Sequence, residues 1–112
     1  MPAVTIWHNP KCGTSRNALA RLREKGIEPK IYLYVEEKPS KAEIEAVLNE
    51  LKLQPSELLR RRQPEAEALE GASETKILAA MTKDALLIER PIVIGKKGAV
   101  LARPIEKLDD IL

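Results

Sequence analysis

The chain has 112 residues, of which 44 % are hydrophobic and 32 % charged, so it has the composition of one folded domain rather than of a disordered or membrane-spanning chain. Nineteen Lys and Arg against 17 Asp and Glu leave a net charge of +2, and aromatic residues make up only 3 %. This balance is typical of neither nucleic-acid surfaces nor base-stacking platforms, so we expect no nucleic-acid partner.

The first third of the chain predicts a strand and a helix followed by a second strand. The elements, in chain order, are a strand at residues 4–7, a loop at 8–14, a helix at 15–25 and a strand at 31–35. Thr14 or Ser15 is suited to cap the start of the helix, and Gly26 stands at the position of its C-cap. A strand–helix–strand unit of this kind predicts two parallel strands with a right-handed crossover.

The middle of the chain predicts mainly helices. Ser40 and Glu43 form a capping box, and behind it apolar residues recur with helical spacing as far as Leu51. Shorter helical segments are predicted at residues 56–61, 65–69 and 74–81, the last with Ser73 as its cap. Residues 82–89 fit either an extended segment or one helical turn.

The last part of the chain predicts a β-hairpin and a closing helix. Residues 91–94 and 99–102 read as two strands joined by a four-residue turn, Gly-Lys-Lys-Gly. Pro91 is a candidate for a cis peptide bond, and Pro104 suits the first position of a helix. That helix is predicted to bury Ile105, Leu108, Ile111 and Leu112.

The order of these elements predicts the fold class. Two parallel strands from the first half and a hairpin from the second would form one four-stranded mixed sheet, in the order β-α-β … β-β-α with a helical insertion in the middle. This is an α/β, thioredoxin-like architecture. With no repeat or linker in the sequence, we expect residues 1–112 to form a single domain.

The sequence also indicates where the protein acts. The apolar run that ends at Trp7 is short and lacks the flanks of a signal peptide, and no apolar run is long enough to span a bilayer. We therefore expect no targeting segment, no membrane association and a reducing cytoplasm. In that compartment Cys12, the single cysteine, would be a free thiol.

Cys12 lies in the loop just ahead of the first helix, where a thiol is expected to be reactive. The first N–H groups of a helix have no intrahelical partner and carry partial positive charge, which stabilises a thiolate. His8 and Arg16 would add positive charge nearby. The same N–H groups, together with the small residues Gly13 and Thr14, would cradle an oxyanion.

Plainer interpretations of the same residues remain open at this point. A lone cysteine is usually a small buried hydrophobe, but the polar neighbours of Cys12 favour the reactive interpretation. His8 is as readily a polar residue at a strand end as a charge partner of the thiolate. One His and one Cys are too few to hold a metal, so no metal site is expected. Because position 15 is Ser15, a second thiol must come from another molecule.

Three arginines far from Cys12 in the sequence are candidates for the same site. Arg90 and Arg103 flank the predicted hairpin and should therefore lie near the same end of the sheet. Arg60 opens a run of three arginines. The ordinary explanation of such residues is solvated surface charge, and we keep it for Arg61 and Arg62.

These motifs resemble a known family. They are the block His-Asn-Pro-Lys-Cys-Gly-Thr-Ser-Arg-Asn at residues 8–17, Leu-Leu-Arg at 58–60, Arg-Pro-Ile-Val at 90–93 and Arg-Pro at 103–104. In combination they resemble the thioredoxin-fold arsenate reductases of the ArsC family that are linked to glutathione and glutaredoxin. The likeness covers nearly the whole chain, and any one of the motifs alone would be weak.

The resemblance implies roles for the residues singled out above. Cys12 would be the nucleophile that attacks arsenate. The substrate would be held by Arg60, Arg90 and Arg103 with Gly13 and Thr14. The thiolate would be stabilised by His8, Ser15 and Arg16.

The resemblance also implies the partners of the reaction. Glutathione would be a co-substrate, with no bound cofactor, and glutaredoxin would be the protein partner that completes the release of arsenite. One alternative is an arsenate-reductase-like monothiol oxidoreductase with another substrate. A less favoured one is an Spx-type regulator that binds RNA polymerase, because such regulators typically carry C-x-x-C, and here Ser15 replaces the second cysteine.

Overall fold

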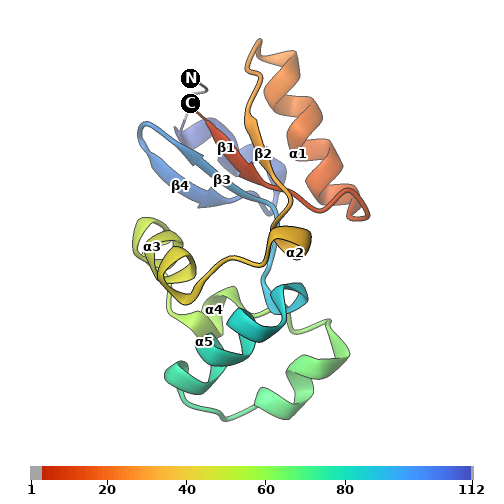
Figure 1. Ribbon diagram of the computed structural model, residues 1–112. Coiled ribbons are helices and arrows are strands. Elements are labelled where there is room, and N and C mark those ends of the chain that lie inside the picture. Colours follow the sequence, from red (N-terminus) through yellow and green to blue (C-terminus); the bar gives the residue numbers. More distant parts are fainter. Residues whose placement is uncertain (1–3, 112) are drawn as a thin grey trace. The chain divides into compact units, whose positions relative to one another are not determined.

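The computed structural model describes residues 4–111. The chain forms two compact units. The first unit contains the sheet and is built from the two ends of the sequence, up to Tyr34 and from Arg90 onward, and the second comprises Val35–Glu89 and is largely helical (Figure 1). That residues 1–112 act as a single domain stays a prediction.

The first unit contains one four-stranded mixed sheet. Its strands are β1 (Thr5–Trp7), β2 (Lys30–Tyr32), β3 (Ile92–Gly95) and β4 (Gly98–Leu101). They lie in the order β2-β1-β3-β4, with β1 parallel to β2 and antiparallel to β3, and with β3 antiparallel to β4. The predicted mixed sheet and thioredoxin-like α/β fold are confirmed.

Helix α1 (Gly13–Glu24) packs on this sheet through its apolar face. Ala18 and Leu22 are fully buried in one cluster with Ile6 of β1 and Val93 of β3. Burying a side chain such as Leu22 contributes about 1.5–3 kcal/mol. The helix ends at Glu24 with Lys25 as its C-cap residue, and Gly26, which was predicted at the C-cap position, follows with a φ of +79° that is readily adopted only by glycine.

The chain closes with the predicted helix, which is the 3₁₀ helix η3 (Ile105–Ile111). Leu108 and Ile111 are buried in the same core, and Ile105 packs against it half-buried. Leu112, also expected in the core, lies outside the described residues. On the surface, Arg21 of α1 pairs with Asp109 at 2.6 Å and so ties η3 to α1.

The second unit is built from helices whose caps follow the sequence. They are α3 (Lys41–Leu51), α4 (Pro55–Leu58), η1 (Pro64–Leu69), α5 (Glu74–Lys83) and η2 (Ala85–Leu87), preceded by α2 (Tyr34–Glu37). The predicted capping box is present, since the Glu43 N–H donates to Ser40 Oγ and the Ser40 N–H donates to the Glu43 carboxylate. The Lys76 N–H donates to Ser73 Oγ, as expected of a cap. Residues 85–87 thus take the helical alternative.

Two local predictions are wrong. The second strand ends at Tyr32 instead of continuing to residue 35, because Tyr34 turns into the core, fully buried, and stacks on Trp7 with ring centroids 6.0 Å apart. The hairpin turn contains two residues and not four, because Gly95 and Gly98 pair with each other. Within residues 4–111, no helix is both long and apolar enough to cross a membrane.

Candidate active site

Cys12 is the N-cap residue of α1, which starts two residues earlier than expected. Its N–H donates to the Asn9 carbonyl at 2.9 Å, and its own carbonyl accepts from the Arg16 N–H at 3.0 Å. The prediction that Thr14 or Ser15 caps the helix is therefore wrong, since both lie inside its first turn. No side chain caps this end, so its N–H groups are free to face the Cys12 sulfur.

The thiol of Cys12 is half-buried and lies among donors. Burial alone would raise the pKa of Cys12. The Ser15 and Thr14 backbone N–H groups and the Arg90 guanidinium outweigh burial, so the pKa of the thiol lies below its ordinary value. The first turn of α1 thus lowers the pKa of Cys12 as predicted, and the Arg90 guanidinium beside the hairpin lowers it as well.

Arg90 and Arg103 meet at the end of the hairpin, as their places beside β3 and β4 predict. Arg103 Nε donates to the Arg90 carbonyl at 2.6 Å, and Arg103 Nη2 lies 3.7 Å from Cys12 Sγ. Each arginine precedes a cis proline; the bond to Pro91 was a candidate from the sequence, and the bond to Pro104 was not.

The Arg90 side chain is buried without a full set of partners. The residue is 7 % exposed, yet Nε and Nη1 of its guanidinium have no hydrogen-bond acceptor among the described residues. A buried cation with unused donors is costly, and such groups are normally paired. Residues 4–111 therefore supply no hydrogen-bond acceptor for these two guanidinium nitrogens of Arg90.

On the opposite side of the loop, His8, Asn9 and Ser15 form a closed polar network. His8 Nδ1 lies 2.6 Å from Ser15 Oγ, and the Asn9 N–H donates to the same oxygen at 3.0 Å. All three residues are buried, Ser15 completely. Ser15 therefore joins the end of β1 to the first turn of α1 and holds the intervening cysteine loop.

Burial lowers the pKa of His8, and the nearby Arg23 and Arg16 guanidinium groups lower it further. The imidazole is thus favoured in its neutral form. A neutral His8 adds no positive charge beside Cys12, so its influence on the thiol passes through its hydrogen bond to Ser15.

Asn9 is a functional candidate that the sequence placed only within the loop of residues 8–14. Its carbonyl accepts from the Cys12 N–H, and its Oδ1 accepts from the Lys11 N–H at 3.0 Å. The signal was the Asn-Pro pair, because an Asn side chain commonly bonds the backbone two residues ahead and closes a turn.

The remaining predicted residues occupy more open positions. Arg16 is exposed and its Nη1 donates to the Pro10 carbonyl at 2.7 Å, which braces the cysteine loop. Gly13 is exposed and Thr14 half-buried in the first turn of α1. Arg16, Gly13 and Thr14 therefore border the cysteine loop without covering it.

Arg60 belongs to the second unit. Its N–H donates to the Leu87 carbonyl at 2.7 Å, and the Leu59–Ile88 bridge continues that pairing. Its guanidinium is mostly buried and forms an ion pair with Glu89 at 3.5 Å, while its Nε has no acceptor among residues 4–111. Arg61 and Arg62 are exposed.

The comparisons with known proteins decide the family. The model of the ArsC family matches residues 7–111. The chain belongs to the ArsC family. It is 43 % identical to an arsenate reductase of Rhizobium meliloti, over 97 % of this chain and 81 % of that protein. It is 40 % identical to an arsenate reductase of Escherichia coli, over the whole chain and 82 % of that protein.

A solved structure shows the same fold as this ArsC family member. The arsenate reductase from Vibrio cholerae superposes with a TM-score of 0.93 and 35 % identity, covering 99 % of this chain and 98 % of that one. The predictions of the family, of the thioredoxin-like fold and of an enzyme, an oxidoreductase, are confirmed.

Proposed function

We propose that this ArsC family protein reduces arsenate to arsenite with Cys12 as the nucleophile, using glutathione and glutaredoxin as reductants. The observation that carries the proposal is the buried Arg90 guanidinium, which has two unused donor atoms and lowers the pKa of the Cys12 thiol. The names of the relatives supply arsenate as the substrate.

Arg90 and Arg103 are suited to hold a tetrahedral oxyanion against the sulfur. A guanidinium presents donors in a planar fork that pairs with two oxygens at once. Arg103 already bonds the Arg90 carbonyl and reaches Cys12 Sγ, so its fork is fixed in place. The bound oxyanion would supply the acceptors that Arg90 Nε and Nη1 lack.

The positive groups also solve an electrostatic problem. A thiolate and an oxyanion repel each other by about 4 kcal/mol at 4 Å and an effective dielectric constant of 20. Two arginines and the first N–H groups of α1 offset this repulsion. We assign Arg60 to the same oxyanion on the family resemblance, and Gly13 and Thr14 to its backbone cradle.

The proposed reaction conserves atoms and electrons. Cys12 attacks arsenic, an oxygen leaves as water, and an arsenic–sulfur bond forms. Glutathione replaces a second oxygen in the same way, again with loss of water. The glutaredoxin thiolate then attacks the glutathione sulfur, which forms a disulfide and leaves its bonding electron pair on arsenic. Arsenic(V) becomes arsenic(III), and hydrolysis of the remaining arsenic–sulfur bond releases arsenite and free Cys12.

The need for outside thiols follows from the cysteine count. Cys12 is the single cysteine of the sequence, so no second thiol of this chain forms the disulfide. We infer that glutathione acts as co-substrate without a bound cofactor, and that the reaction takes place in the cytoplasm, where such thiols are kept reduced.

A coupled assay tests the proposal. The protein is incubated with arsenate, glutathione, glutaredoxin and NADPH-linked recycling of glutathione, and NADPH consumption is followed. We expect arsenate-dependent turnover that Cys12→Ser abolishes. The reductase proposal fails if the wild-type protein shows no arsenate-dependent NADPH consumption; reduction of low-molecular-weight disulfides without arsenate turnover would favour the monothiol oxidoreductase instead.

Paired arginine variants test the oxyanion site. Arg60→Gln should reduce kcat/KM for arsenate by at least tenfold, because it removes a guanidinium from the anion. Arg62→Gln, which removes an exposed guanidinium from the same segment, should change it by less than twofold. Equal effects of the two substitutions would show that Arg60 is an ordinary charged residue that does not bind the anion.

A further inference from the structure

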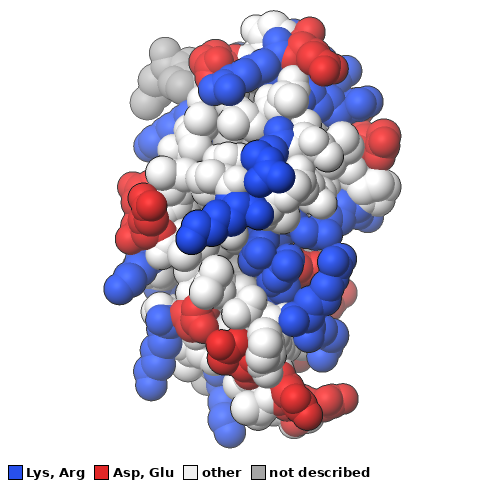
Figure 2. All heavy atoms as spheres, turned by 90° about the vertical axis from the view of Figure 1, so that its right-hand side faces the viewer, with Lys and Arg blue, Asp and Glu red and all other residues white. Residues whose placement is uncertain are grey.

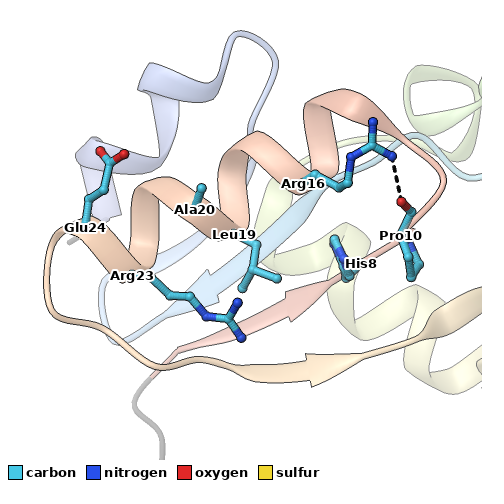
Figure 3. Close-up of a pocket in the computed structure, with 7 residues that line it drawn as sticks. All are labelled: His8, Pro10, Arg16, Leu19, Ala20, Arg23 and Glu24. Carbon is cyan, nitrogen blue, oxygen red and sulfur yellow. Dashed lines mark hydrogen bonds between the residues drawn. The ribbon is translucent and has the colours of Figure 1, made fainter.

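A groove in the first unit runs along the outer side of α1 and does not belong to the oxyanion site. It has a volume of about 660 Å³, is open to solvent, and begins at His8, Pro10 and Arg16, within one helical turn of Cys12 (Figure 3). From there it continues past Leu19 and Ala20 to Arg23 and Glu24, so its far end carries one carboxylate beside the two arginines. Arg90 and Arg103 are not among its lining residues.

The groove combines an apolar floor with positive charge. Leu19 lies between Arg16 and Arg23 in the sequence of α1, and the close-up view shows the Arg23 guanidinium near Leu19 and the Arg16 guanidinium at the start of the helix, bonded to the Pro10 carbonyl (Figure 3). His8, which lines the groove, has a pKa lowered first by burial and then by these two cations. The space-filling view of the side on which α1 lies shows basic side chains with acidic ones among them (Figure 2).

The spacing of the charges indicates the kind of ligand. Arg16 and Arg23 are seven residues apart on α1, which places them about 10 Å apart along the helix axis. One carboxylate or one oxyanion is too small to reach both. Acidic side chains on one face of an extended segment are about 7 Å apart at positions i and i+2 and about 13 Å apart at i and i+4, which brackets this spacing.

We propose that this groove is the docking surface for an acidic segment of the protein thiol reductant that acts on Cys12. The inference rests on the proposed function, in which a glutaredoxin must approach the cysteine loop. An acidic segment would pair with Arg16 and Arg23 and cover Leu19 with an apolar side chain. Charge complementarity of this kind mainly raises the association rate and makes it dependent on salt.

The test uses a reaction that needs the partner but not arsenate. Oxidised glutathione converts Cys12 into a mixed disulfide, and glutaredoxin then attacks the glutathione sulfur and releases the Cys12 thiolate. The rate constant with glutaredoxin is divided by that with 2-mercaptoethanol, a small neutral thiol, to correct for any change at the disulfide itself. Both are measured at low and at high ionic strength.

Two substitutions at the distal end of the groove separate docking from folding. Arg23 pairs with the exposed Glu28, at 3.1 Å, so Arg23→Glu both reverses the groove charge and breaks that pair. The double variant Arg23→Glu/Glu28→Arg keeps an ion pair and the net charge while still reversing position 23. Arg62→Glu makes the same change of net charge on an exposed residue of the second unit.

We expect both Arg23 variants to lower the normalised rate about tenfold at low salt, with a much smaller difference at high salt. Arg62→Glu should lower it by less than twofold. The inference is overturned if the Arg23 variants match the wild-type protein, if Arg62→Glu has an equal effect, or if no glutaredoxin cleaves the wild-type mixed disulfide. If the wild-type protein does not reduce arsenate but glutaredoxin cleaves its mixed disulfide at a rate that depends on Arg23, only the proposed function is refuted.

Discussion

Cys12 lies between two buried polar regions that differ in how their hydrogen bonds are satisfied. On one side, His8, Asn9 and Ser15 form a network in which the Ser15 hydroxyl serves both neighbours. On the other side, Arg90 is buried to a similar degree, but two of its guanidinium nitrogens have no acceptor among the described residues.

We infer from this difference that the first group holds the geometry of the site and that Arg90 binds the oxyanion of the proposed reaction. A satisfied buried network stabilises the free protein and defines one geometry. A buried, incompletely paired charge destabilises the free protein, and an acceptor that arrives later offsets that cost. We therefore expect substitutions in the two regions to act on different quantities, activity on the Arg90 side and folding on the Ser15 side.

The largest effect is expected from Arg90→Met. This side chain fills a similar space without donors, so kcat/KM for arsenate should fall by about 100- to 1,000-fold, the range found when a preorganised donor to a developing anion is lost. The free energy of unfolding should stay constant or rise, because a costly buried charge is removed. Steady-state kinetics and urea denaturation measure the two quantities.

Arg90→Lys separates the effect of the positive charge from that of the paired guanidinium donors. It keeps the charge and removes the fork, so activity should recover only in part while the free energy of unfolding changes little. If Arg90→Met instead unfolds the protein, the buried guanidinium is a structural group and the contrast between the two regions does not hold.

The next effect is expected from Ser15→Ala. The substitution leaves the His8 imidazole and the Asn9 N–H buried without their shared partner, at a cost of about 1–3 kcal/mol in the free energy of unfolding. Urea denaturation measures it. Ser73→Ala is the matched control, because it removes a serine hydroxyl from the start of another helix. It should leave the titration of the Cys12 thiol, measured by thiolate absorbance, unchanged.

A smaller effect concerns the acidity of Cys12. The thiolate absorbance of the wild-type protein should titrate with a midpoint below the value of about 8.5 for a free cysteine. Below that midpoint the thiol is protonated and kcat/KM should fall. Arg90→Met should move the midpoint upward, since the guanidinium lowers the pKa of Cys12, whereas a midpoint unaffected by Arg90 would leave the helix N-terminus as the sole cause.

The smallest effect is the pH dependence of stability that His8 introduces. Its pKa is lower in the folded protein than its ordinary value, so the unfolded chain binds more protons between these two values. The free energy of unfolding should therefore fall as the pH drops below about 6.5, by no more than about 1.4 kcal/mol per pH unit. His8→Gln should remove this component, and an identical pH profile in that variant would show that His8 does not titrate there.

Much of the fold was predictable because its signals are local. The capping box at Ser40, the cap at Ser73 and the glycine that ends α1 each act over a few residues, and the structure contains all three. The second strand was predicted too long, because its apolar pattern does not reveal that Tyr34 turns inward onto Trp7. This contact joins residues that are far apart in the sequence, so no local pattern predicts it.

The candidate site was predictable in its members but not in their arrangement. The motif places Cys12 ahead of a helix, and the hairpin places Arg90 near Arg103. The sequence did not reveal that Ser15 lies inside the helix and binds His8, because a serine before a helix ordinarily caps it. Nor did it show the burial of Arg90, which depends on the packing of distant segments.

The first unit is assembled from both ends of the sequence, and this has a consequence for biosynthesis. A ribosome makes Cys12 before Arg90 and Arg103, with the helical segment of residues 35–89 between them. Until the hairpin is added, the nascent thiol lacks both guanidinium groups that act on it in the finished protein. We therefore expect the cysteine of a nascent chain to gain the effect of these guanidinium groups on its pKa only after residue 103 has been made.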